Sequence, residues 1–188
     1  MKYDKSVLRN KFLFQRKKKY LEARKFNFNL IFKLIKKHFR NKKITIGGYY
    51  PSNYEVNILN FLKRASKKNF RIVLPVIKPP NKMSFKLWVF KEPLYINQFG
   101  IPEPKKSKKT IIPNLIMVPL VVFDNHLNRI GYGKGYYDRS LRKISKTKKN
   151  VISLGIAYSF QKCKKIPTNN YDFKLDYIFT EKGIINSS

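Results

Sequence analysis

The chain has 188 residues, about the size of one domain, and its 43% hydrophobic and 15% aromatic content excludes an intrinsically disordered protein despite a net charge of +32. A single cysteine, Cys163, excludes an intramolecular disulfide framework and a cysteine-rich zinc site, and it favours a reducing compartment. No apolar stretch approaches the roughly 20 residues that span a bilayer, and no signal-peptide core is visible, so we expect a cytoplasmic protein without a membrane partner.

The positive charge, 42 Lys and Arg against 10 Asp and Glu, is by itself typical of a nucleic-acid binder. Lysine, however, occurs at polar positions along the whole chain, and even the runs at 15–19 and 105–109 are short. The preference for Lys, Asn, Ile, Phe and Tyr is what A/T-rich codons produce by mutational drift. We therefore expect no specific nucleic-acid partner, while an RNA-binding or ribosome-associated protein stays open as the alternative.

The first half of the chain alternates helical and strand patterns. Apolar residues at helical spacings predict an amphipathic helix from Asp4, which can cap it, to about residue 25, and a second helix from about 28 to near 41. Strand-favouring residues follow over 44–50. Asn53-Tyr-Glu55 is then predicted to open a third helix, and 70–75 is predicted to be a second strand.

The second half continues this alternation. The unbroken apolar run 115–123 is typical of a central strand covered on both faces. The whole pattern predicts an α/β fold, a single layered α/β/α domain over residues 1–188 with a central, mostly parallel but mixed sheet. Further strands are predicted over 83–90, 151–158 and 177–180, with a surface loop over 100–113, a turn over 124–128 and a helix around 137–144.

The most informative segment is Asn128 to Arg139, in which Gly131, Gly133 and Gly135 alternate. Glycine lets backbone N–H groups face one concavity and lets a bulky anion approach, and the flanking Arg and Lys residues supply positive charge. A following helix would add the positive end of its dipole. The spacing matches neither a P-loop nor a dinucleotide-binding motif. It predicts phosphate binding, and a tight hairpin turn is the alternative.

Asp138 is a carboxylate inside this cationic segment. An acid is favourable in the first turn of a helix, where the dipole is positive. It is also a hard oxygen ligand that suits magnesium bound to nucleotide phosphates. Both interpretations stay open, and we prefer the metal role.

With these motifs in hand, almost the whole chain resembles the 5-formyltetrahydrofolate cyclo-ligase family, also called 5,10-methenyltetrahydrofolate synthetase. The resemblance rests on an ordered set of blocks, which is more specific than any single block. The glycine-rich segment is the last of them. The blocks are Lys5-Ser-Val-Leu-Arg9, the turn at 50–55, 74–77 with 83–85, 100–104, and 118–139.

The resemblance implies an enzyme that uses ATP and magnesium to convert 5-formyltetrahydrofolate to 5,10-methenyltetrahydrofolate, releasing ADP and phosphate. Transfer of the γ-phosphoryl group to the formyl oxygen would activate it, and N10 of the folate would then attack the formyl carbon. Such chemistry needs chiefly positioning and charge neutralisation. The implied partners are the two small-molecule substrates, and we expect a monomer. A non-catalytic relative is disfavoured because Lys134, Asp138 and Glu55 are present.

The resemblance also assigns residues to ATP. Lys5 and Arg9 would approach the phosphates from the first helix, although without the resemblance they would be an ordinary solvated basic face. Lys134 and Arg129 are the expected catalytic residues. The remaining ATP contacts would come from Ile130, Gly131, Tyr132, Gly133, Gly135, Tyr136 and Tyr137.

Folate and magnesium are assigned in the same way. Glu55 would accept paired N–H donors of the pterin ring, or would simply be an acid in a first helical turn. Tyr50 and Phe99 would form apolar walls, or belong to the core. Tyr132 stands where other members carry arginine. The loop residues Tyr132, Gly133, Lys134, Gly135 and Tyr136 would complete the folate site, and Asp138 and Asp176 would bind magnesium.

Overall fold

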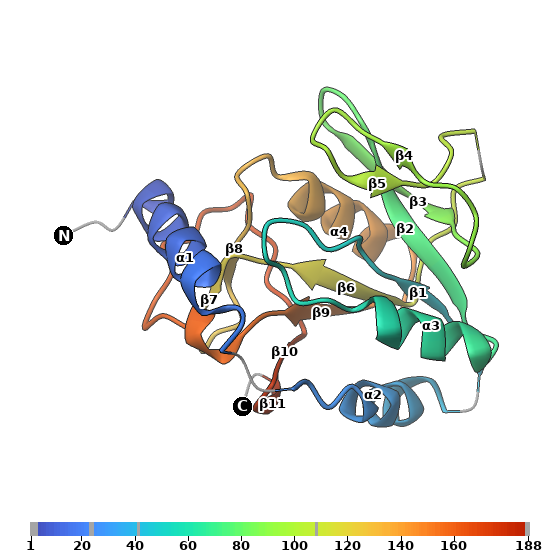
Figure 1. Cartoon of the computed structure of the whole chain (residues 1–188), viewed down its shortest axis with the longest axis horizontal. Coiled ribbons are helices and arrows are strands. Elements are labelled where there is room, and N and C mark those ends of the chain that lie inside the picture. The colour runs from blue at the N-terminus through green and yellow to red at the C-terminus, as the bar shows by residue number, and fades with distance from the viewer. Residues whose placement is uncertain (1–3, 23–24, 41, 108, 187–188) are drawn as a thin grey trace.

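The computed structural model describes residues 4–22, 25–40, 42–107 and 109–186 (Figure 1). Its helices are α1 (Lys5–Lys19), α2 (Asn29–Phe39), α3 (Leu59–Lys67) and α4 (Tyr136–Thr147), with a 3-10 turn η1 (Ser159–Gln161). The large sheet contains β1 (Thr45–Gly47), β2 (Arg71–Lys78), β3 (Lys82–Leu87), β6 (Leu115–Pro119), β9 (Ile152–Ile156), β10 (Tyr177–Thr180) and β11 (Gly183–Asn186). Two short hairpins pair β4 (Tyr95–Ile96) with β5 (Pro102–Glu103) and β7 (Val122–Phe123) with β8 (Arg129–Ile130).

The seven-stranded sheet has the order β11-β10-β9-β6-β1-β2-β3. The strands from β10 to β2 run parallel, and β11 and β3 are antiparallel at the two edges. In the centre, Ile46 of β1 is in register with Leu115 of β6. Because parallel strands end at the same edge, the segments that follow β1 and β6 emerge side by side. Those segments contain Glu55 and the glycine-rich loop.

Helices cover both faces of this sheet, which confirms the predicted layered α/β fold. On one face α2 and α3 pack over residues such as Ile46 of β1 and Leu154 of β9. On the other face α4 packs over residues such as Ile116 and Val118 of β6. The alternate residues of each strand thus serve two separate cores, as expected for strands buried on both sides.

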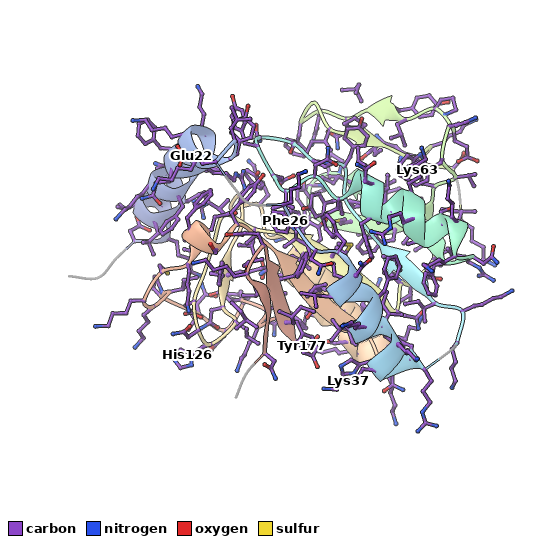
Figure 2. The ribbon with its side chains drawn as sticks, turned by 60° about the horizontal axis from the view of Figure 1, so that its bottom comes forward. Glu22, Phe26, Lys37, Lys63, His126 and Tyr177 are labelled. Carbon is purple, nitrogen blue, oxygen red and sulfur yellow. The ribbon has the colours of Figure 1, made fainter. Side chains whose placement is uncertain are left out.

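Aromatic residues close the first core near the amino end of α2. Phe26, near the centre of Figure 2, has its ring centroid 5.6 Å from those of Tyr158 and Phe179, in edge-on arrangements. Phe28 stacks on Phe61 of α3 at 5.7 Å. The chain between α1 and α2 is therefore attached to the sheet by ring packing.

Helix α1 lies at one end of the sheet, beside β7 and β8 (Figure 1). Its Leu8 and Phe12 are buried against Val122 of β7 and Ile130 of β8. Asp4 caps the helix as predicted, since its carboxylate accepts a hydrogen bond from the Ser6 backbone N–H. No helix in the described ranges is long and apolar enough to cross a bilayer.

Several predicted boundaries were wrong. Asn53 and Tyr54 have φ values of +46° and +62°, so the segment before Val56 is a turn, and α3 begins only at Leu59. The apolar run 115–123 contains two strands, β6 and β7, separated by residues 120–121. The first helix ends at Lys19, and the part of the prediction at residues 23–24 lies outside the described residues.

Candidate active site

The glycine-rich loop connects β8 to the amino end of α4. Gly133 and Gly135 have φ values of +91° and +65°, a region that residues with a side chain seldom adopt. A Cβ on Gly133 would stand 3.2 Å from the guanidinium carbon of Arg9, and one on Gly135 would stand 2.7 Å from Nη1 of Arg139. The positive φ values favour glycine at both positions, and the ends of the Arg9 and Arg139 side chains would have to move to admit a Cβ. No side chain caps the start of α4, and Arg9 and Arg139 lie against the loop, an arrangement that suits an anion.

One face of α1 is directed at this loop. Residues 5, 9 and 16 are spaced by four and seven positions and so lie on the same side of the helix. Lys5 Nζ donates to Asp172 Oδ1 at 2.7 Å, and Arg9 Nε donates to the Gly131 carbonyl oxygen at 2.8 Å. Arg16, which is 1% exposed, donates to the Leu120 carbonyl oxygen at 3.2 Å. Arg9 thus contacts the glycine-rich loop directly, whereas Lys5 is ion-paired with Asp172, and their assignment to ATP stays a prediction.

Glu55 and the loop meet through a tyrosine. The Tyr132 hydroxyl donates to Glu55 Oε1 at 2.9 Å, and the Ser52 backbone N–H donates to Oε2 at 2.9 Å. Arg16 Nη2 in turn donates to the Tyr132 hydroxyl. Burial raises the pKa of Glu55, and the Ser52 N–H and the Arg16 charge oppose that rise. The predicted pterin-binding carboxylate is thereby held beside the glycine-rich loop.

The other predicted folate residues lie on the opposite flank of the loop. Phe99 is 41% exposed, and its ring lies edge-on to Tyr136 with centroids 6.2 Å apart. The Tyr136 hydroxyl donates to the Pro80 carbonyl oxygen at 3.3 Å. Tyr50 is half-buried in the segment that follows β1. Phe99 and Tyr136 form an accessible aromatic wall, which is a suitable surface for a flat ring.

The loop's charged and apolar side chains divide into two groups. Lys134 is exposed, and within the described residues its ammonium group makes no hydrogen bond or ion pair. Arg139 Nη2 donates to the Lys134 carbonyl oxygen at 2.6 Å and so fixes the backbone beneath that side chain. Ile130 is buried with the residues of α1, and Tyr137 packs against the core under α4. Because the Ile130 side chain is buried, this residue could contact a ligand only through its backbone.

Asp138 and Asp176 accept hydrogen bonds from different residues. Asp138 Oδ1 accepts from Arg129 Nη1 at 2.7 Å and from the Phe173 N–H at 3.1 Å. Asp176, at the amino end of β10, accepts from the N–H and hydroxyl of Ser153 at 2.8 and 2.6 Å. No three His, Cys, Asp or Glu side chains in the described part of the chain could hold a metal ion together. This arrangement does not fit a magnesium site shared by the two carboxylates, and the Arg129 guanidinium is occupied by Asp138.

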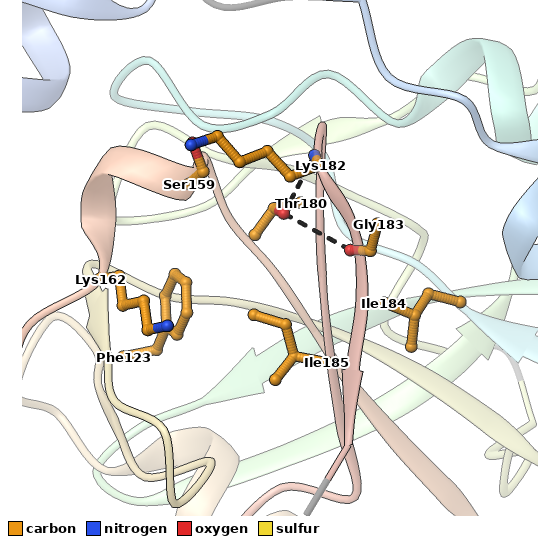
Figure 3. Close-up of a pocket in the computed structure, with 8 residues that line it drawn as sticks. All are labelled: Phe123, Ser159, Lys162, Thr180, Lys182, Gly183, Ile184 and Ile185. Carbon is orange, nitrogen blue, oxygen red and sulfur yellow. Dashed lines mark hydrogen bonds between the residues drawn. The ribbon is translucent and has the colours of Figure 1, made fainter.

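A pocket of about 200 Å³ lies away from these residues, between η1 and the β10–β11 turn (Figure 3). Thr180 organises that turn, since its hydroxyl accepts from the Lys182 N–H at 3.2 Å and donates to the Gly183 carbonyl oxygen at 3.4 Å. The pocket is lined by Phe123, Ser159, Lys162, Thr180, Lys182, Gly183, Ile184 and Ile185. It contains no predicted site residue.

Arg16 is the contact residue that the sequence patterns did not identify. It stands in the basic run 15–19, where nothing in composition separates it from its neighbours. The available signal is its position seven residues after Arg9 and eleven after Lys5, which places it on their face of the helix. That face also carries the buried Phe12. A charged residue that shares a helix face with buried apolar residues is the pattern that could have indicated a buried cation.

Comparison with known proteins agrees with this geometry. Residues 1–181 match the model of the 5-formyltetrahydrofolate cyclo-ligase family. The chain is 32% identical to the 5-formyltetrahydrofolate cyclo-ligase of Haemophilus influenzae over 69% of its own length and 72% of the relative's, and 30% identical to that of Escherichia coli K12 over 74% and 79%. The solved 5,10-methenyltetrahydrofolate synthetase of Aquifex aeolicus superimposes with a TM-score of 0.76 at 30% identity, covering 97% of this chain and 92% of that one. The Mycoplasma pneumoniae synthetase gives 0.70 at 26%, covering 95% and 99%. The chain therefore belongs to the 5-formyltetrahydrofolate cyclo-ligase family and is an enzyme.

Proposed function

We propose that this enzyme uses ATP to convert 5-formyltetrahydrofolate to 5,10-methenyltetrahydrofolate, with release of ADP and phosphate. The observation that carries the proposal is the meeting of three features at the carboxyl edge of the sheet. These are the cationic face of α1, the glycine-rich loop at the start of α4, and the Glu55 carboxylate. The first two suit a polyphosphate, and the third suits a ring with paired N–H donors.

The ATP phosphates are proposed to bind against the loop. The uncapped N–H groups at the start of α4 and the positive end of its dipole face the same side as Arg9 and Lys134. Lys134 is the best candidate to contact the transferred phosphoryl group, because its ammonium group is exposed and unpaired within the described residues. Arg129 is proposed to act through the loop, since its guanidinium is paired with Asp138.

The folate is proposed to lie between Glu55 and the wall made by Phe99 and Tyr136. Each carboxylate oxygen can accept two hydrogen bonds. Glu55 Oε1 accepts one from Tyr132, whereas Oε2 accepts one from the Ser52 N–H at 2.9 Å and a longer one from the Ser52 hydroxyl at 3.4 Å. One position on Oε1 is therefore open, and one on Oε2 is proposed to open when the Ser52 hydroxyl turns away. Two neighbouring N–H donors of the pterin ring would fill these positions. The rest of the molecule would pass over the loop, with its formyl group near the ATP phosphates.

The proposed reaction is a phosphoryl transfer followed by ring closure. The formyl oxygen attacks the γ-phosphorus, forming an O–P bond as the bond to the bridging oxygen breaks and ADP departs. The N10 lone pair then attacks the formyl carbon, N10 loses its proton, and the C–O bond breaks to release phosphate. Both steps depend on alignment and on positive charge around the phosphoryl oxygens more than on a strong acid or base. Lys134, Arg9 and the loop N–H groups supply that charge.

Magnesium, which the family resemblance implies, is proposed to arrive with ATP as part of that substrate. Asp138 and Asp176 bind different partners, so neither is assigned to it in this arrangement. The monomeric state, the cytoplasmic location, the single domain and the lack of a specific nucleic-acid partner stay predictions. A steep salt dependence of RNA binding with no effect of ATP on the protein would favour the alternative.

The experiment that tests the proposal mixes the purified protein with MgATP and 5-formyltetrahydrofolate. We expect the near-ultraviolet absorbance of the methenyl product to rise together with free phosphate, one phosphate for each product. Omission of ATP is expected to abolish both signals. Folded protein that produces neither signal with both substrates present would overturn the proposed function.

A further inference from the structure

Arg16 is a buried cation that the proposed reaction does not use directly. Its side chain is 1% exposed, yet among the described residues its hydrogen-bond acceptors are the neutral Leu120 carbonyl oxygen and Tyr132 hydroxyl. Its Nε has no hydrogen-bond partner among the described residues. Burying a charge without a direct counter-ion is costly. A residue kept in that state, behind the substrate loop, points to a role in the site.

The direction of the hydrogen bonds beyond Arg16 is fixed by chemistry. A guanidinium can only donate, so the Tyr132 hydroxyl must accept from Arg16, and its own single proton is directed to Glu55. Burial raises the pKa of Tyr132, so the hydroxyl keeps that proton. The Arg16 guanidinium also lies over the Tyr132 ring, 5.6 Å from its centroid, which restricts where the ring can go. Arg16, Tyr132 and Glu55 therefore form a polarised chain.

Resting on the proposed function, we propose that Arg16 is a positioning residue of the folate site. Through the Tyr132 hydroxyl it holds the Glu55 carboxylate in place for a ligand with two neighbouring N–H donors, such as a 2-amino-4-oxopyrimidine ring. The opposite side of the carboxylate is held by the Ser52 N–H at 2.9 Å. Both oxygens are thus oriented before the ligand arrives, which lowers the ordering cost of binding.

The charge of Arg16 matters as well as its hydrogen bond. Tyr132, Tyr49, Tyr137 and Tyr158 lie near Glu55, and Arg16 is the cation whose charge lowers the Glu55 pKa against the effect of burial. Removing that charge lets the pKa of Glu55 rise further. An ionised carboxylate is needed to accept two N–H donors, so folate binding would then be lost at a higher pH as the solution is acidified.

The test uses the full chain with three variants of this hydrogen-bonded chain and one control. Tyr132→Phe removes only a hydroxyl from a side chain that is 37% exposed, so it is expected to fold. Arg16→Met and the double variant Arg16→Met/Tyr132→Phe complete a mutant cycle. Tyr177→Phe is the matched control, because it removes a tyrosine hydroxyl that bonds His38 outside the site. The Kd of 5-formyltetrahydrofolate without ATP is measured by calorimetry, and KM and kcat are measured for both substrates.

We expect Tyr132→Phe to raise the folate Kd and KM by roughly tenfold, the effect of one hydrogen bond to a charged group, and to change the ATP KM by much less. The double variant should be little weaker than either single variant, and Arg16→Met should shift the acid limb of the folate kcat/KM to higher pH. Additive losses in the cycle, or a Tyr132→Phe folate Kd within twofold of the wild type, would overturn the inference. If Arg16→Met does not fold, the folate Kd of Tyr132→Phe alone decides whether the inference holds. The wild type could prove inactive and still bind folate more tightly than Tyr132→Phe. That result would overturn the proposed reaction but would support the positioning role of Arg16.

Discussion

Asp138 offers a comparison that separates a structural carboxylate from a metal ligand. Two ion pairs lie near the loop: Arg129 Nη1 is 2.7 Å from Asp138 Oδ1, and Lys5 Nζ is 2.7 and 2.5 Å from the two carboxylate oxygens of Asp172. Both carboxylates are 24% exposed, but the Arg129 side chain is 3% exposed and that of Lys5 is 25%. Asp138→Asn therefore leaves a buried guanidinium without its counter-ion, whereas Asp172→Asn leaves an ammonium group that water can reach.

The expected magnitudes differ accordingly. Breaking a buried pair costs about 3–5 kcal/mol, and the partial exposure of Asp138 reduces our expectation to about 2–3 kcal/mol. The Lys5–Asp172 pair is worth about 0.2–1 kcal/mol. In both variants the amide oxygen can still accept the backbone N–H bond, from Phe173 or from Asn169.

Urea denaturation in the presence of a chelator, without ATP, measures both effects. A midpoint shift of about 1 M or more is expected for Asp138→Asn and a clearly smaller one for Asp172→Asn, because urea changes the free energy of unfolding by about 1–3 kcal/mol per molar. Equal midpoints for the two variants would refute the structural role of Asp138. A loss of stability confined to magnesium-loaded protein would indicate instead that Asp138 is a metal ligand.

Three further substitutions test individual parts of the site. Lys134→Ala is expected to lower kcat by about 10²–10³-fold without changing the unfolding midpoint, since the side chain is exposed, and wild-type turnover would contradict its catalytic role. Phe99→Ala should raise the folate KM by about 2- to 10-fold through loss of the aromatic wall with Tyr136, with the ATP KM as the control that must not move. Gly135→Ala places a side chain at a φ of +65° and against Arg139. We therefore expect a loss of about 1–2 kcal/mol in unfolding free energy and a higher ATP KM. A stable variant with normal ATP affinity would show that the loop tolerates other geometries.

The layered α/β fold could be predicted because its strands and helices have clear periodicities. The run that forms β6 is apolar at every position, as a strand covered on both faces requires, and Asp4 has the side chain that a helix cap needs. The same continuity hid the break at residues 120–121. Apolar residues continue through that break because Val121 and Val122 pack against α1. The spacing of apolar residues cannot show that some of those before the break pack under α4 and some of those after it pack against α1.

The turn before Glu55 was mispredicted for a conformational reason. Val56, Leu59 and Leu62 have a helical spacing, but positive φ at Asn53 and Tyr54 prevents a helix from starting there. The strained turn positions the Glu55 carboxylate toward Tyr132. A local spacing rule cannot anticipate this, because the contact joins residues 77 positions apart.

The site was only partly visible in the sequence. The glycines and cations of the loop were found because their pattern is unusual for a strand or helix, and Lys5, Arg9 and Glu55 came from the family resemblance. Arg16 was missed because it is one basic residue in a basic run, and its burial depends on where α1 docks. The protein partners of Asp138 and Asp176, Arg129 and Ser153, could not be predicted, because the topology brings them to each carboxylate from distant parts of the chain or from across the loop. The assignment of these two carboxylates to magnesium stays a prediction.

The central claim is that this site transfers a phosphoryl group to the formyl oxygen of the folate. The most direct measurement supplies 5-formyltetrahydrofolate labelled with ¹⁸O in the formyl group, together with unlabelled MgATP, and analyses the released phosphate by mass spectrometry. The proposed reaction predicts one heavy oxygen atom in each phosphate molecule, because the O–P bond forms before the C–O bond breaks. Unlabelled phosphate with full conversion to the methenyl product would contradict it.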